Sequence, residues 1–145
     1  MSVAVEVVED VSDEIVEAFG RLLPQLSRSA PALSAKELAE LAAWPGSRLL
    51  IAKVDGQIMG TLTLVTFPIP TGMRAWIEDV VVDEAARGRG VGAALTNEAV
   101  RLAQTAGART VDLTSRPSRE AANRLYQRLG FQPRETNVYR YEQPK

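Results

Sequence analysis

The chain has 145 residues, of which 46% are hydrophobic and 24% are charged, and its 17 Lys and Arg nearly balance 18 Asp and Glu to leave a net charge of −1. A chain of this length and composition can bury a globular core, which excludes a disordered or fibrous protein. The balanced charge excludes a global basic field for nucleic acid, and no apolar run reaches membrane-spanning length. Because the N-terminus also lacks a basic start followed by an apolar stretch, we expect one cytoplasmic domain over residues 1–145, with no nucleic-acid or membrane partner.

Two residue types are absent, and their absence restricts the chemistry. The chain has no Cys, which excludes disulfides, thiolate catalysis and cysteine-ligated metal. It also has no His, the commonest general base and the commonest metal ligand. If the protein is an enzyme, then Glu, Asp, Tyr, Ser, Lys or backbone groups must carry its chemistry, and we expect no metal site.

The first 45 residues are predicted to form one strand and two helices. Residues 3–8 alternate and are β-branched, which is typical of a strand. Ser12 is a suitable N-cap, and the apolar side chains behind it follow helical spacing: Ile15, Val16, Phe19, Leu22 and Leu23. Pro24 is expected to interrupt that pattern. A Ser-x-x-Glu capping box from Ser34 to Glu37 begins the second helix.

Two strands joined by a tight turn are predicted next. Residues 49–54 form the first strand, and Asp55-Gly56 is a strong hairpin signal that leads into the second, residues 57–66. The following segment, FPIPTG (67–72), is expected to be a loop because its two prolines cannot sit in a central strand.

The second half of the chain alternates strands and helices. Residues 75–82 end in a near-continuous apolar run, which is typical of a strand covered on both faces. A helix follows over residues 91–106, then a strand over 110–114, a helix over 119–129 and a strand-like segment over 131–141. The order β-α-α-β-β-β-α-β-α-β predicts a single α/β domain.

A glycine-rich loop lies between the strand at 75–82 and the helix that follows. Gly88, Gly90 and Gly92 fall within five residues, and Arg87 and Arg89 add positive charge. A helix N-terminus has unpaired N–H groups and a partial positive charge, and glycine lets a ligand approach the backbone closely. This pattern favours an anion-binding site over a surface turn in which Gly serves geometry and Arg serves solubility.

Two common nucleotide motifs fit this loop less well. The phosphate-loop pattern needs a Gly-Lys-Ser/Thr ending, which is missing. Gly88, Gly90 and Ala93 have the spacing of the dinucleotide fingerprint, and Asp112 lies near the offset of its ribose-binding acid. However, five residues separate the strand from the first glycine, and only one helix and one strand remain after Asp112. A full doubly wound nucleotide domain therefore does not fit.

The loop and its flanks resemble a known family. Arg87-Gly88-Arg89-Gly90-Val91-Gly92 is similar to the Gln/Arg-x-x-Gly-x-Gly/Ala signature of the GNAT acyltransferase superfamily, whose loop binds the pyrophosphate of acetyl-CoA. Residues 77–82 and 123–131 resemble that superfamily's central strand and its last helix-strand junction. The likeness spans residues 75–131, and the first 50 residues are compatible with the family's variable acceptor-binding helices.

This resemblance implies a fold and a cofactor site. The fold would be α/β (α+β), with about four helices and a mixed, mostly antiparallel sheet of six to seven strands. Strands 75–82 and 110–114 would form a splayed parallel pair that holds the pantetheine arm of acetyl-CoA, with a backbone N–H polarising the acetyl carbonyl. The residues expected to bind the cofactor are Val80, Val81, Val82, Arg87, Gly88, Arg89, Gly90, Val91, Gly92, Ala93, Ser118, Arg119, Asn123 and Tyr126.

The implied activity is an acetyl-CoA-dependent N-acetyltransferase, in which the amine attacks acetyl-CoA directly within a ternary complex. Glu78 is the expected base and Asp79 the alternate, and adjacent strand residues are expected to face opposite ways. An unperturbed Glu has a pKa of about 4.3, so an effective base near neutral pH needs burial. The alternative is that one of the two is a structural acid in a core salt bridge.

Tyr126 is the expected catalytic acid. A phenol with a pKa of about 10 stays protonated at neutral pH and can donate to a departing thiolate. The alternative is a packing residue with its hydroxyl at the surface. Many relatives carry Asn seven residues earlier, where this chain has Arg119, so Asn123 is expected to contact CoA instead. Ser118 and Arg119 either meet a phosphate or cap and solvate the helix.

The acceptor is the partner that the sequence determines least. Trp44, Phe67 and Trp76 are expected to line its pocket, although aromatic residues near loops are more often packing residues. A small amine, an amino acid derivative and a peptide amine all fit. Residues 77–82 also resemble glucosamine-phosphate N-acetyltransferases, but no early phosphate-binding motif accompanies them. A homodimer that pairs residues 138–141 is a further expectation, and a CoA-binding sensor without turnover is the alternative function.

Overall fold

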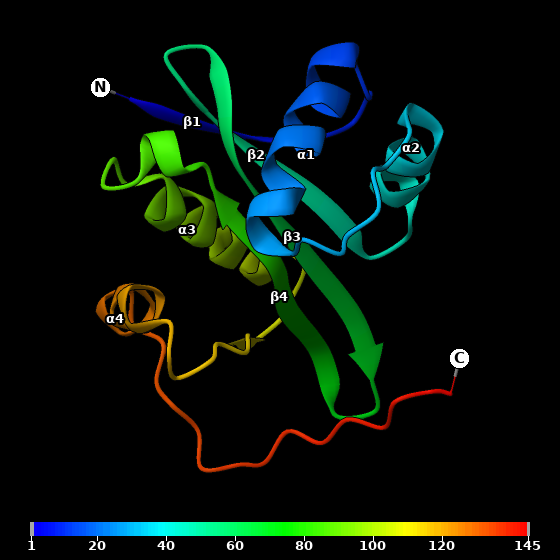
Figure 1. Ribbon diagram of the computed structural model, residues 1–145. Coiled ribbons are helices and arrows are strands. Elements are labelled where there is room, and N and C mark those ends of the chain that lie inside the picture. The colour runs from blue at the N-terminus through cyan, green and yellow to red at the C-terminus, as the bar shows by residue number, and fades with distance from the viewer. Residues whose placement is uncertain (1, 145) are drawn as a thin grey trace. The chain divides into compact units, whose positions relative to one another are not determined.

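The computed structural model describes residues 2–144 and consists of two compact units, Met1–Thr114 and Ser115–Lys145. The first unit contains the sheet and three α-helices, and the second contains one α-helix and the C-terminal segment (Figure 1). The likeness to the GNAT superfamily spans both units, so one domain over 1–145 remains our prediction.

The first unit is built on a mixed sheet with the strand order β1-β2-β3-β4-β5. Its strands are β1 (Val3–Val7), β2 (Ser47–Val54), β3 (Gln57–Ile69), β4 (Gly72–Val82) and β5 (Val111–Asp112). Neighbouring strands pair antiparallel except β4 and β5, which are parallel. The helices are α1 (Asp13–Leu26), α2 (Ala35–Ala43), the short 3₁₀ turn η1 (Glu84–Ala86), α3 (Val91–Thr105) and, in the second unit, α4 (Glu120–Arg128).

The predicted fold class is confirmed, with five strands in the described residues rather than six to seven. The missing strand is the one expected at 131–141, and that prediction is wrong: no strand forms between residues 131 and 144. Pro133 cannot donate a ladder hydrogen bond. The aromatic side chains beyond it gain no burial, since Tyr139 and Tyr141 are 88% and 85% exposed. Nothing therefore stabilises a strand over the other extended conformations.

The prediction of a loop at residues 67–72 is also wrong. β3 continues to Ile69 and β4 begins at Gly72, so only Pro70 and Thr71 form the turn. The last β2–β3 pair joins Ser47 to Val65, and beyond it β3 has only β4 as a neighbour. Pro68 lies on this local edge, where its missing N–H costs the sheet little. Pro24 likewise lies inside α1, near its end, instead of interrupting it.

Local signals set several element boundaries as predicted. The hydroxyl of Ser12 accepts the N–H of Ile15 at 3.3 Å and caps α1. Ser34 and Glu37 form the reciprocal capping box of α2, with contacts of 3.0 and 3.1 Å. Residues 55 and 56 adopt positive φ angles of 51° and 82° in the tight hairpin between β2 and β3.

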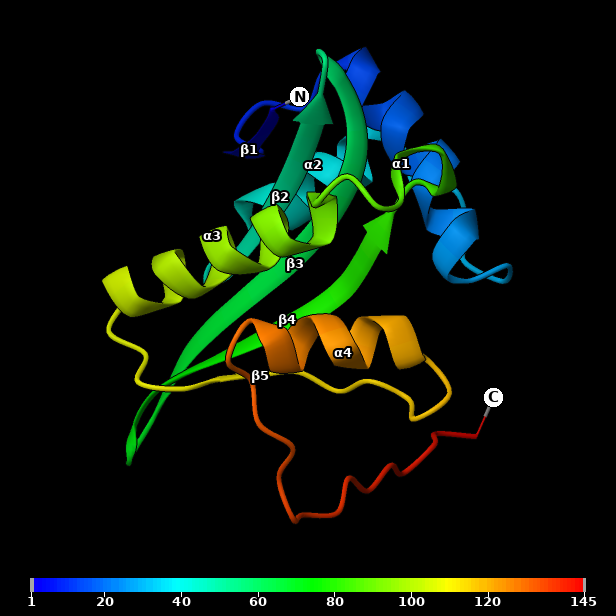
Figure 2. The same ribbon diagram turned by 90° about the vertical axis from the view of Figure 1, so that its left-hand side faces the viewer.

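Helices cover both faces of the sheet: α1 and α2 lie on one face and α3 on the other (Figures 1 and 2). The α1/α2 face contains a buried cluster that joins the helices to β2, β3 and β4. Its fully buried members include Ala18 and Leu22 of α1 and Leu38 of α2, packed with Leu49, Ile51, Ile58 and Val81 of the sheet. Burial of this apolar surface fixes where α1 sits relative to the end of β4.

On the other face, α3 approaches β3 closely at Gly60. A Cβ on Gly60 would lie 2.7 Å from Cγ1 of Val91 and 3.1 Å from Cδ1 of Leu95. We expect Gly60→Ala to lower the free energy of unfolding by about 1–3 kcal/mol, because the first turn of α3 must move away from the sheet. Urea unfolding measures this change.

Gly20→Ala is the matched control for this substitution. Gly20 lies in α1, and an added Cβ there meets nothing within 4 Å. The control is expected to gain roughly 0.5–1 kcal/mol from helix propensity. If Gly60→Ala is as stable as the wild type, α3 is not packed against Gly60.

Candidate functional site

The glycine-rich loop connects β4 to α3 through η1. Gly88 and Gly90 have φ angles of 80° and 79°, a region that residues with a Cβ rarely adopt. Gly90 is the N-cap residue of α3, and no side chain caps this helix. Residues 87–90 are exposed, so the loop that leads into this helix N-terminus is accessible to a ligand with negative charge.

Next to this loop, the second half of β4 has no strand partner on one side. β5 pairs with β4 only at Ala75–Val111 and Trp76–Asp112. Beyond Trp76, residues 77–82 pair with β3 on one side, and no strand of the described residues pairs with them on the other. We call this unpaired side of residues 77–82 the open edge of β4. At its closed end, Nη2 of Arg74 lies 3.1 Å from Oδ2 of Asp112 and joins the two strands.

The candidate base and its alternate lie on the open edge, at a β-bulge. The β3–β4 register passes from Thr63–Glu78 to Thr61–Val81, so β4 has one extra residue there. Asp79 has a φ of 50°, and strict alternation of side chains therefore fails at this point. Both carboxylates are exposed, which argues against a structural acid in a buried salt bridge.

The sheet register places Glu78 on the α1/α2 face. Glu78 pairs with Thr63, which pairs with Leu49 of the buried cluster beneath α1 and α2. Trp76 and Phe67 lie on the same face, because Trp76 pairs with Val65 and Phe67 with Arg74. One carboxylate and two aromatic rings therefore share this face of the sheet.

The three predicted acceptor residues differ in exposure. Trp44 is the C-cap residue of α2 and is 67% exposed, Phe67 is 36% exposed and Trp76 is half-buried. The exposed faces of Trp44 and Phe67 are available for contact with a ligand. The structure brings Phe67 and Trp76 to the face that carries Glu78, and it places Trp44 at the end of a helix that covers that face.

The second unit contains Ser118, Arg119, Asn123 and Tyr126. Asn123 donates from Nδ2 to the carbonyl oxygens of Arg116 and Arg119, both at 2.9 Å, and so holds the turn that precedes α4. Ser118 and Arg119 are exposed at that turn. The structure therefore gives Asn123 a local structural role that its spacing in the sequence did not indicate.

Tyr126 is partly buried within α4. Its ring contacts that of Phe131 edge-on, with centroids 5.8 Å apart. Burial raises the pKa of the Tyr126 phenol above its usual value of 10.0, and the positive charge of Arg119 opposes this only in part. The phenol is therefore fully protonated at neutral pH and can act as a proton donor.

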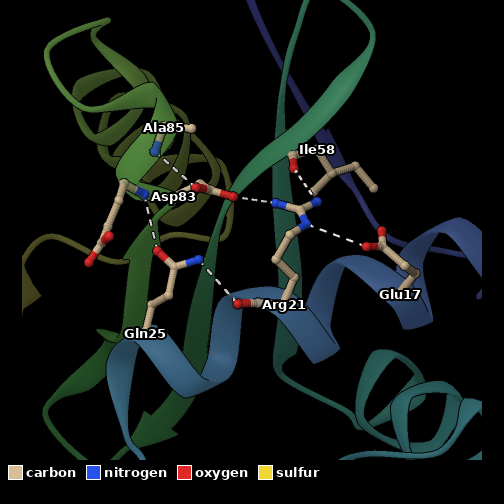
Figure 3. Close-up of polar contacts among 7 residues, drawn as sticks. Glu17, Arg21, Gln25, Ile58, Asp83 and Ala85 are labelled. Atoms are coloured by element: carbon tan, nitrogen blue, oxygen red, sulfur yellow. Dashed lines mark hydrogen bonds and ion pairs between the residues drawn. The ribbon is translucent and has the colours of Figure 1, made fainter.

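Sequence reasoning missed a polar network around Asp83, which begins the connection from β4 to η1 (Figure 3). Asp83 accepts the N–H of Ala85 at 3.0 Å and pairs with the guanidinium of Arg21 in α1. The Ala85 N–H is the largest cause that lowers the pKa of Asp83, and Arg21 lowers it further. Arg21 and Asp83 are 62 residues apart, so no local pattern could have indicated the pair.

Residues 2–144 contain neither a helix suited to span a membrane nor a side-chain cluster suited to hold a metal ion. No helix of this part of the chain is both long and apolar enough to cross a bilayer. No group of three or more acidic, His or Cys side chains in the described residues is arranged to hold a metal ion.

Comparisons with known proteins agree with this geometry. Residues 11–131 match the model of the acetyltransferase (GNAT) family. The chain is 37% identical to a glucosamine 6-phosphate N-acetyltransferase of Trypanosoma brucei brucei, over 75% of this chain and 78% of that one. It is 35% identical to a probable glucosamine 6-phosphate N-acetyltransferase of Oryza sativa subsp. japonica, over 79% and 74% of the two chains. A solved structure of a putative acetyltransferase from Agrobacterium tumefaciens is 26% identical, with a TM-score of 0.84 over 96% of this chain and 99% of that one.

Proposed function

This chain belongs to the GNAT acetyltransferase family and is an acetyl-CoA-dependent N-acetyltransferase, and from that premise we propose that it acetylates a primary amine by direct attack within a ternary complex. One observation carries the proposal: a strand with an open edge leads through η1 and the glycine loop, with two glycines at positive φ, to an α-helix N-terminus without a side-chain cap. The first feature suits a diphosphate, and the second suits an extended amide-containing arm.

In this proposal the glycine loop and the open edge bind different parts of acetyl-CoA. Backbone N–H groups of residues 88–92 bind the diphosphate, and Arg87 and Arg89 add charge. Backbone groups of Val80 and Val82 pair with the pantetheine arm, since no strand of the described residues occupies that side of β4. An N–H of this edge then polarises the thioester carbonyl and stabilises the oxyanion that forms on attack.

The proton transfers require one base and one acid. Glu78 accepts a proton from the acceptor ammonium, directly or through water, and Asp79 is the alternate base. The neutral amine attacks the thioester carbon, and the C–S bond breaks as the tetrahedral intermediate collapses. Tyr126 donates its phenolic proton to the CoA thiolate; burial raises the pKa of this phenol, so the proton is present at neutral pH.

We propose that the acceptor is a small amino sugar, and that an amino sugar phosphate is the preferred member of this class. Two relatives at 37% and 35% identity carry the name glucosamine 6-phosphate N-acetyltransferase. Glu78 shares a sheet face with Trp76 and Phe67, and a carboxylate beside aromatic rings suits a cationic amine on a ring with an apolar face. Amino acid derivatives and peptide amines are the comparison classes.

Measuring CoA release with a panel of amines tests this proposal. We expect turnover with glucosamine 6-phosphate or a related amino sugar, and slower release with amino acid amides and peptides. Tight binding of CoA without turnover on any amine contradicts the enzymatic proposal and supports a CoA sensor.

On the best acceptor, Glu78→Gln is expected to lower kcat by about a hundredfold at neutral pH, the usual contribution of a general base. The defect should shrink as the pH rises, because the acceptor amine then loses its proton to solvent. Asp79→Asn is the matched neighbouring variant and should change kcat by less than Glu78→Gln. The reverse order assigns the base to Asp79, and affinity for CoA serves as the folding control for both variants.

A further inference from the structure

We propose that Arg21 and Gln25 of α1 are positioning residues for the glycine loop, so that affinity for the diphosphate of acetyl-CoA depends on a helix that lies on the opposite face of the sheet from α3. The inference rests on the proposed role of the loop. It adds that α1 helps to set the geometry of the loop. Figure 3 shows the contacts of Arg21 and Gln25 on which this inference is based.

Arg21 joins α1 to β3 and to the residue that follows β4. Its Nη1 pairs with Oδ2 of Asp83, the first residue after β4. Its Nη2 donates to the carbonyl oxygen of Ile58 in β3 at 2.9 Å. A guanidinium presents donors in a fixed planar fork, so one side chain fixes the carboxylate relative to the β3 backbone.

Gln25 extends the connection by one helical turn. Its Nε2 donates to the carbonyl oxygen of Arg21 at 3.1 Å, and its Oε1 accepts the backbone N–H of Glu84 at 3.0 Å. The two side chains of α1 thus hold consecutive residues of the connection, Asp83 by its carboxylate and Glu84 by its backbone. Asp83 is also held through its own N–H, which donates to the carbonyl oxygen of Met59 at 2.8 Å.

These contacts lie directly upstream of the loop. Oδ1 of Asp83 accepts the N–H of Ala85. The backbone carbonyl oxygen of Asp83 accepts the N–H of Ala86 at 2.8 Å, and these contacts form η1. Only residues 87–90 then separate η1 from the buried Val91 at the start of α3, which packs close to Gly60. The exposed loop is therefore anchored at both ends, and α1 supplies side-chain contacts at the upstream end.

A loop of four residues with two positive φ angles has few ways to join fixed ends. Releasing the upstream end adds conformations in which the N–H groups no longer converge on one anion. Binding the diphosphate must then reorder the loop, which weakens affinity without altering the chemical step. The consequence is specific to ligands that contain the diphosphate.

The test compares two acetyl donors: acetyl-CoA and acetyl-pantetheine, which lacks the diphosphate and the nucleotide. Arg21→Met is expected to raise the KM for acetyl-CoA about tenfold, by analogy with the loss of a residue that orients a metal ligand, while kcat stays close to the wild-type value. The value of kcat/KM for acetyl-pantetheine should stay at the wild-type level. Gln25→Ala should raise the KM for acetyl-CoA by a smaller factor, and Arg21→Lys should recover part of the loss.

Glu17→Gln is the matched control. Glu17 contacts Arg21 at 3.4 Å from an exposed position and lies on the far side of the Arg21 guanidinium from Asp83 in Figure 3. This variant should keep the wild-type KM for both donors. Gln25 is exposed, so Gln25→Ala provides a folded variant even if Arg21→Met is unstable.

Two outcomes overturn the inference. One is a KM for acetyl-CoA in Gln25→Ala and Arg21→Met that matches the KM of Glu17→Gln. The other is an equal loss with both donors, which assigns Arg21 and Gln25 to general stability of the fold. Failure of the underlying loop assignment looks different: Gly90→Asp, a substitution within the loop itself, would then bind CoA as tightly as the wild type.

Discussion

Gly90→Asp is expected to weaken binding of acetyl-CoA by about a hundredfold or more, because the new carboxylate repels the diphosphate and a side chain strains the backbone at a φ of 79°. The cause is local to the loop, since an added Cβ at Gly90 meets no atom within 4 Å. Isothermal titration calorimetry with CoA measures the change in affinity.

Gly56→Asp is a closely matched control for this substitution. Gly56 has a φ of 82°, and an added Cβ there also meets nothing within 4 Å. It lies in the β2–β3 hairpin, so both variants introduce the same charge and the same strain of about 1–2 kcal/mol. Gly56→Asp should bind CoA as the wild type does. Equal affinity in Gly90→Asp and the wild type would show that the diphosphate does not bind at residues 88–92.

Tyr126→Phe is expected to lower kcat by about a hundred- to a thousandfold, the range for loss of a general acid. The substitution keeps the ring and its edge-on contact with Phe131, and it removes only the hydroxyl. The KM for acetyl-CoA should therefore remain close to the wild-type value. Steady-state kinetics on the best acceptor provides both constants.

The direction of the pKa shift of Tyr126 determines how kcat should depend on pH. Burial raises the pKa of Tyr126 above 10.0, so its phenol stays protonated across the neutral range and up to that pKa. Deprotonation of Tyr126 therefore cannot lower the wild-type kcat near neutral pH. The control variants are Tyr139→Phe and Tyr141→Phe. Both rings are exposed, so these substitutions should leave kcat at the wild-type value. If Tyr126→Phe turns over as fast as the controls, another group protonates the thiolate.

Local sequence signals predicted most of the fold. Capping residues such as Ser12 and Ser34 and the Asp55-Gly56 turn act over a few residues, so their boundaries could be read from the chain. Two of the wrong predictions, the loop at 67–72 and the strand at 131–141, depended on contacts between segments that are distant in the sequence. Pro68 is accommodated in β3 because β2 has already ended there, and 131–141 forms no strand because its aromatic side chains remain exposed.

In the candidate site, too, features set by neighbouring residues could be predicted and features set by distant contacts could not. The glycine loop could be predicted because its pattern is contiguous, and the likeness to GNAT proteins depends on that contiguity. The bulge at Asp79 could not, because it arises from a register shift against β3. The contacts of Arg21 and Gln25 with residues 83 and 84 were equally invisible, since they join segments that meet only in the folded unit.

The short pairing of β5 with β4 bears on thermal stability under the proposed mode of cofactor binding. Two residue pairs join these strands in the described residues, so acetyl-CoA bound at the open edge as we propose would add contacts to this part of the sheet. A ligand that binds only the native state raises stability by RT ln(1 + [L]/Kd), about 2.7 kcal/mol at a hundredfold excess over Kd. The melting temperature then follows the supply of coenzyme, and depletion leaves the enzyme more open to unfolding.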